Sequence, residues 1–95
     1  FPFSDGSAVK HRPALIVQSD AIKSPDTVLA MISSTQSDTS VFLNPDPKTG
    51  IKQPCYVRCE KLYSIEVTAV FGSVGRLSKK TMQEVDACLR NVLGV

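Results

Sequence analysis

The sequence predicts a mainly β protein with some α structure, of the α+β class: a small barrel or strongly bent sheet closed by a C-terminal helix. Short apolar, β-branched runs follow one another through residues 14–71, with turn-rich segments between them. A single segment with helical spacing comes after them, and nothing supports an alternating parallel α/β layout. At 95 residues and 42% apolar content, the chain is expected to form one domain over residues 1–95.

The expected strands are short. They lie at residues 14–17, 27–32, 41–43, 56–59 and 65–71. The first is a continuous apolar run, which predicts a strand buried on both faces. Alternation in the fourth places Val57 and Cys59 on one face, with Tyr56 and Arg58 on the other. Residues 44–50 are rich in proline, glycine, asparagine and aspartate, and are expected to form an exposed connection.

The terminal helix has the clearest signals. Ser78 can cap its first turn, and Gly94 suits its C-terminal exit. Apolar residues recur every three or four positions between these ends, at Met82, Val85, Leu89 and Val92. This stripe predicts a helix that covers one face of the sheet.

Charge and cysteine content exclude several classes of protein. Eleven basic and nine acidic residues give a net charge of +2, which allows a localised cationic groove but not general polyanion binding. Three cysteines (Cys55, Cys59 and Cys88) and one histidine indicate neither a disulfide framework nor a four-ligand zinc site. We expect free, reduced thiols and a cytoplasmic protein. No apolar run is long enough to cross a membrane, and no secretory signal is visible.

Two polar clusters lie at the ends of expected strands. Residues 10–12 (Lys10, His11 and Arg12) precede the strand that begins at residue 14, and residues 33–36 follow the strand that ends at residue 32. The sequence has no glycine-rich phosphate loop and no paired-histidine metal motif, so chemistry must depend on charged donors and hydroxyls. The clusters could meet across adjacent strands. Read as structure alone, they are a solvated turn and a polar strand exit.

Residues 1–7 and 10–17, with Arg12 and Pro13 before an apolar strand, resemble the opening strand, loop and Arg-Pro strand of MazF/PemK toxins. Residues 31–34 are similar to the family segment whose threonine works beside that arginine, and residues 74–78 resemble the turn into the family's terminal helix. The resemblance spans residues 1–95. It implies an SH3-like barrel of the MazF/PemK/CcdB toxin type that forms a homodimer, with the start of its first strand missing before Phe1.

The resemblance also implies a function. Family members cut single-stranded RNA at short sequences without a metal or other cofactor, leave a 2′,3′-cyclic phosphate and a 5′-hydroxyl, and are neutralised by a cognate antitoxin protein. Carried over by position, Arg12 matches the catalytic arginine and Ser33 the catalytic threonine. The expected substrate contacts are Lys10, His11, Ser34, Gln36 and Arg58.

Elementary chemistry supports part of this assignment. Arg12 offers a fixed fork of N–H donors for phosphate oxygens, and Ser33 can add a hydroxyl donor. His11 is the side chain that titrates near neutrality, but in a fully extended segment it points away from the face of Arg12. Two alternatives remain open at this point: a non-catalytic toxin of the same fold that binds a protein, as gyrase poisons do, and an inactive interaction module.

Overall fold

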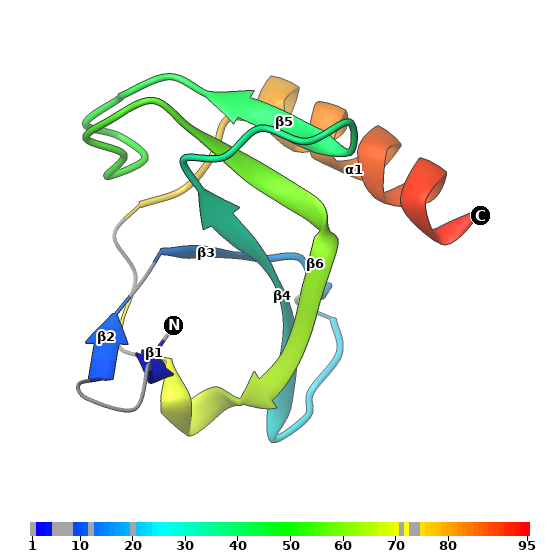
Figure 1. Cartoon of the computed structure of the whole chain (residues 1–95). Helices are drawn as coiled ribbons and strands as arrows, with labels where there is room; N and C mark the ends of the chain where they lie inside the picture. Colours follow the sequence, from blue (N-terminus) through cyan, green and yellow to red (C-terminus); the bar gives the residue numbers. More distant parts are fainter. Residues whose placement is uncertain (1, 5–8, 12, 20, 71, 73–74) are drawn as a thin grey trace.

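The computed structural model describes residues 2–4, 9–11, 13–19, 21–70, 72 and 75–95, with the backbone alone for 2–4 and 9–11 (Figure 1). Its strands precede a short 3₁₀ turn and a final helix. The elements are β1 (Pro2–Ser4), β2 (Val9–His11), β3 (Ala14–Ile16), β4 (Asp26–Ser33), β5 (Ser40–Leu43), β6 (Cys55–Glu66), η1 (Val67–Ala69) and α1 (Lys79–Leu93).

All described strand pairs are antiparallel. β1 pairs with β2, and a second sheet has the strand order β3-β4-β6-β5. Figure 1 shows that the larger sheet curls into a half-barrel and that α1 lies beside β5 and β6, the strands that it contacts most. The predicted fold class, mainly β with a C-terminal helix, is therefore confirmed.

Strand β6 is much longer than the sequence indicates. Its pairing with β4 steps from Ala30↔Leu62 to Met31↔Arg58, so one step along β4 corresponds to four along β6. This bulge bends β6 and lets one strand pair with β4 along its length and with β5 near its start. The prediction of a separate strand at residues 65–71 is wrong, because β6 continues to Glu66 and a 3₁₀ turn follows at Val67–Ala69.

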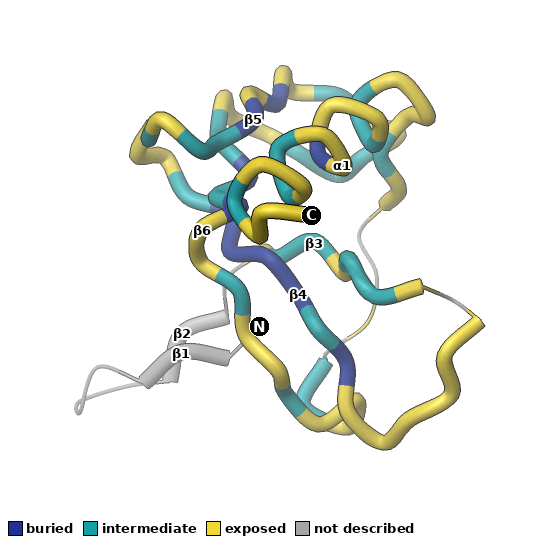
Figure 2. Tube along the Cα trace, turned by 90° about the vertical axis from the view of Figure 1, so that its right-hand side faces the viewer, coloured by how far each residue is buried: buried dark blue, intermediate teal, exposed yellow. Residues whose placement is uncertain are grey.

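The core lies between the sheet and α1. Val57, Cys59 and Val85 are fully buried there, which confirms the predicted inward face of β6. Figure 2 shows that buried backbone follows β4 and the parts of β5 and β6 beside α1. The prediction that residues 14–17 are buried on both faces is wrong. β3 is an edge strand, and Ile16 stays 48% exposed.

Both ends of α1 match the predicted capping signals. The Ser78 hydroxyl accepts a hydrogen bond from the Thr81 N–H at 3.2 Å, and Gly94 adopts the left-handed conformation with φ of 73°. Val85 is the buried residue of the apolar stripe, and the other stripe residues are half-buried. Within the described part of the chain, no helix is both long and apolar enough to cross a membrane.

Candidate active site

The structure describes Ser33 but not Arg12, the other residue of the predicted catalytic pair. Ser33 is the last residue of β4, whereas Arg12 lies outside the described residues. Lys10 and His11 belong to β2, where the backbone pairs them with Phe3 and Pro2.

The register of β3 against β4 determines which chain segments meet near Ser33. Ala14, the first residue of β3, pairs with Met31, and Leu15 pairs with Ala30. The strands are antiparallel, so the beginning of β3 lies beside the end of β4. The chain that follows position 12 in the sequence thus reaches the sheet at the end of β4 that carries Ser33.

The Ser33 side chain is half-buried, and its hydroxyl oxygen accepts a hydrogen bond from the Thr35 N–H at 3.1 Å. This contact fixes the oxygen and leaves the O–H proton undonated to any partner among the residues described. Ser34 and Gln36, in the loop after β4, are exposed. The site therefore has one oriented hydroxyl that can donate to an incoming ligand.

Arg58 is bound to a carboxylate that the sequence analysis did not select. Its Nε and Nη2 atoms lie 2.9 and 2.7 Å from the same Glu60 oxygen, Oε2. The other oxygen, Oε1, accepts hydrogen bonds from the hydroxyls of Ser37 and Thr39. Glu60 thus compensates the charge of Arg58 and ties β6 to the loop that follows Ser33. The sequence does contain a sign of this pair: Arg58 and Glu60 have opposite charges and stand two positions apart, so they lie on the same face of a strand.

These contacts shift the titration of Glu60. Its partial burial alone would raise the pKa, but hydrogen bonds from its own backbone N–H, Thr39, Arg58 and Ser37 outweigh that effect and lower the pKa to about 2. The carboxylate therefore stays charged at any pH at which the protein is expected to work. Its role here is to hold the loop, since a base with so low a pKa accepts a proton poorly.

We expect this carboxylate to make stability fall in acid. Its pKa is lower in the folded protein than the ordinary value of 4.5, so its stabilisation is present above pH 4.5 and is lost as the pH falls toward 2. Urea unfolding over this range should show a steeper decline in the free energy of unfolding for the wild type than for Glu60→Gln. Glu84→Gln, a change at an exposed carboxylate on α1, is the matched control and should decline like the wild type.

The three cysteines are free, as predicted. Burial and the neighbouring Cys88 thiol raise the pKa of Cys59 to about 12, and burial raises the pKa of Cys55. Such thiols stay protonated near neutrality and are poor nucleophiles. Within the described ranges, no group of three or more His, Cys, Asp or Glu side chains is placed to hold a metal ion.

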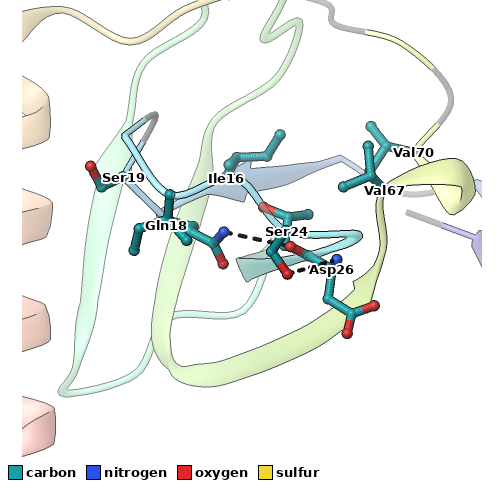
Figure 3. Close-up of a pocket in the computed structure, with 9 residues that line it drawn as sticks. Ile16, Gln18, Ser19, Ser24, Asp26, Val67 and Val70 are labelled. Atoms are coloured by element: carbon teal, nitrogen blue, oxygen red, sulfur yellow. Dashed lines mark hydrogen bonds between the residues drawn. The ribbon is translucent and has the colours of Figure 1, made fainter.

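A shallow pocket of about 240 Å³ lies elsewhere, between β3, the start of β4 and η1. Figure 3 shows Ile16, Val67 and Val70 around it, with the Gln18 amide near the backbone of Asp26. Ser33, Ser34, Gln36 and Arg58 do not line this pocket. This pocket is therefore not the predicted site, whose described residues lie at the end of β4, in the loop after it and on β6.

A family model of the PemK-like, MazF-like toxins of type II toxin-antitoxin systems matches residues 1–93. The chain belongs to this toxin family. The match covers nearly the whole sequence, so it confirms the resemblance read from the separate segments. A search of curated protein sequences finds no significant match.

Solved structures of PemK/MazF toxins share the fold. Mycobacterium tuberculosis toxin MazF-mt6 superimposes with a TM-score of 0.78 at 23% identity, over 88% of this chain and 87% of that one. An endoribonuclease solved in complex with its cognate antitoxin, from a mycobacterial species, gives 0.80 at 20% identity, over 100% and 90%. Another mycobacterial endoribonuclease gives 0.75 at 22% identity, over 88% and 81%.

Proposed function

We propose that this PemK/MazF family member is a sequence-specific, metal-independent endoribonuclease toxin that cleaves single-stranded RNA, including mRNA. The products are a 2′,3′-cyclic phosphate end and a 5′-hydroxyl end. The observation that carries the proposal is the β3–β4 register, which brings the chain after position 12 to the end of β4, where the Ser33 O–H has no acceptor among the described residues. Endoribonuclease names among the structural neighbours add support.

The mechanism needs fixed donors around the scissile phosphate. The ribose 2′-hydroxyl loses its proton to water and attacks the phosphorus, so a new P–O bond forms. The bond to the 5′ oxygen breaks, and this oxygen takes a proton from water to leave as a hydroxyl. Negative charge grows on the phosphate oxygens as this happens. The Arg12 guanidinium stabilises that charge with its fork of N–H donors, and Ser33 donates its hydroxyl to the same group. Arginine stays protonated, so Arg12 acts through charge and not as a free base.

The direct test is to incubate the purified protein with a long single-stranded RNA in excess chelator and to map the ends of the fragments. We expect cuts at one short recurring sequence, with cyclic phosphate and 5′-hydroxyl ends. Intact RNA, or cleavage that stops when the metal is removed, would contradict the proposal. End mapping also gives the recognition sequence directly.

Substitutions at Ser33 test whether its hydroxyl acts in the reaction. Ser33→Ala is expected to reduce the cleavage rate by about 10²-fold, because one donor to the developing charge is lost. Ser33→Thr keeps the hydroxyl and restricts its rotamers, so it should retain activity. Single-turnover cleavage measures both rates. Ser64→Ala removes an exposed serine hydroxyl from β6, away from Ser33, and should cleave like the wild type. Equal activity in the alanine and threonine variants would remove Ser33 from the mechanism.

The structure supports some of the other proposed substrate contacts more than others. Ser34 and Gln36 are exposed beside Ser33, and Lys10 and His11 come just before Arg12 in the sequence. Arg58 is a weaker contact than its position indicated, because Glu60 already compensates its charge. A phosphate must compete with that carboxylate.

The protein partners also belong to this proposal. We infer a cognate antitoxin, since one structural neighbour was solved with its own antitoxin. We also propose that the toxin is cytoplasmic and forms a homodimer. Two exposed apolar side chains support the dimer: Ile16 and Tyr63, which are 48% and 40% exposed and lie on either side of the buried Leu29 in one cross-strand row. This row lies on the face opposite the α1 core. Sedimentation of the purified toxin gives its oligomeric state.

A further inference from the structure

An aromatic pair extends from Ser33 across the sheet. Ser33 pairs with Tyr56 on β6, and Tyr56 pairs with Phe42 on β5, so the three side chains share one face. The two rings lie with centroids 5.4 Å apart and an interplanar angle of 56°. Phe42 is 46% exposed, although it is a large apolar side chain. Two strand spacings separate Ser33 from Phe42, which is about 10 Å.

Phe42 also borders a groove of about 410 Å³ between the end of β5, the turn after it and the start of α1. The groove is held in shape by a close backbone contact. A Cβ atom added at Gly75 would lie 2.4 Å from the Thr49 carbonyl carbon and 2.6 Å from the Lys48 carbonyl oxygen. The Arg76 N–H donates to the same Lys48 carbonyl at 3.3 Å. The contact therefore fixes Arg76 beside the turn.

The groove carries more positive than negative side chains. Lys48, Arg76 and Lys80 line it together with Asp46 and Glu84. All three cations are exposed, and none forms an ion pair within the described part of the chain. One carboxylate oxygen of Asp46, Oδ1, already accepts a hydrogen bond from the Lys48 N–H at 2.8 Å. Three cations against two carboxylates leave the groove with a small positive charge, which favours a polyanion.

We propose that the aromatic pair and this groove bind the nucleotides that flank the cleavage site in single-stranded RNA. An unstacked base packs on Phe42 and Tyr56, and Lys48, Arg76 and Lys80 contact the following phosphates. The exposed Phe42 ring, packed on the half-buried Tyr56 ring and next to a cationic groove, suits single-stranded nucleic acid, since bases stack and the backbone is anionic. The inference rests on the proposed ribonuclease function. It adds a path for the part of the RNA that extends past Ser33.

The test uses a fluorescein-labelled, mixed-sequence single-stranded RNA with 2′-O-methyl groups, which lacks the attacking hydroxyl and so reports binding without cleavage. Phe42→Leu should weaken binding about tenfold, and Phe42→Tyr should bind like the wild type. Replacing Lys48, Arg76 and Lys80 with glutamine should weaken binding and reduce the slope of log affinity against log salt by about 2. Circular dichroism confirms that each variant is folded.

The matched control removes the same charge from another part of the surface. The triple glutamine variant of Lys23, Lys61 and Arg90, all exposed and outside the groove, should bind with nearly the wild-type salt slope. Equal losses in the two triple variants would overturn the inference, as would wild-type affinity in Phe42→Leu or no binding by the wild type. Binding of polyglutamate in preference to the RNA would also overturn it, in favour of an acidic protein partner.

A parallel cleavage assay on unmodified RNA separates this inference from the proposed function. If the wild type cleaves RNA and the Phe42 and groove variants bind RNA as tightly as the wild type, the flanking site is overturned and the ribonuclease proposal stands. If the Phe42 and groove variants weaken binding but the wild type cuts no RNA, these residues form a binding site for single-stranded RNA and the ribonuclease proposal is overturned.

Discussion

Arg12→Ala is expected to reduce the rate of RNA cleavage by about 10³-fold and to leave the fold intact. The guanidinium is the cation assigned to the developing phosphate charge, and alanine supplies no donor in its place. Arg12→Lys keeps the charge without the planar fork, so its rate should lie between those of alanine and the wild type. Single-turnover cleavage of one mapped site measures the three rates.

The control for this prediction is Arg90→Ala, which removes an exposed arginine near the end of α1 and should leave the rate unchanged. Thermal unfolding followed by circular dichroism shows whether each variant is folded. A folded Arg12→Ala variant that cleaves at the wild-type rate would remove the proposed active site. Toxicity that survives changes at both Arg12 and Ser33 would favour a toxin that acts by binding a protein.

Val85→Asp is expected to lower the free energy of unfolding by about 4 kcal/mol or more, a large part of the 5–15 kcal/mol that stabilises most domains. Val85 is completely buried and joins α1 to the core formed with Val57 and Cys59. A carboxylate at this position would lose its hydration among the apolar side chains of the core. Urea unfolding measures the change.

Ala87→Asp provides the matched comparison for this substitution. Ala87 lies on the exposed side of the same helix, so its variant adds the same side chain in water. We expect a loss below about 1 kcal/mol, mainly from helix propensity. Equal destabilisation by the two substitutions would show that the Val85 contact contributes little to the fold.

The elements that the sequence predicted well are those with local signals. Ser78 and Gly94 mark the ends of α1, because capping depends on residues within one turn of the helix. The strand at residues 27–32 appears as β4, extended by one residue at each end. Apolar residues bounded by a turn are sufficient to indicate such a strand.

The bulge in β6 shows where local reading fails. Arg58 pairs with Met31 and Leu62 pairs with Ala30, so two even-numbered residues of β6 face opposite sides of the sheet. A rule based on simple alternation cannot detect this inversion, and it divides β6 into separate strands. The Glu60 contacts with Ser37 and Thr39 were missed for a related reason. They depend on strand pairing between segments more than twenty positions apart.

The tight approach of Gly75 to the backbone of Lys48 and Thr49 links two distant stretches of sequence. A side chain at position 75, or an insertion between Asp46 and Gly50, would push the two main chains apart and shift where α1 begins. Relatives that lengthen this turn should therefore also alter the segment before their terminal helix. The turn at residues 46–50 and the segment before α1 are expected to change together among relatives. The strands around Ser33 can change independently of them.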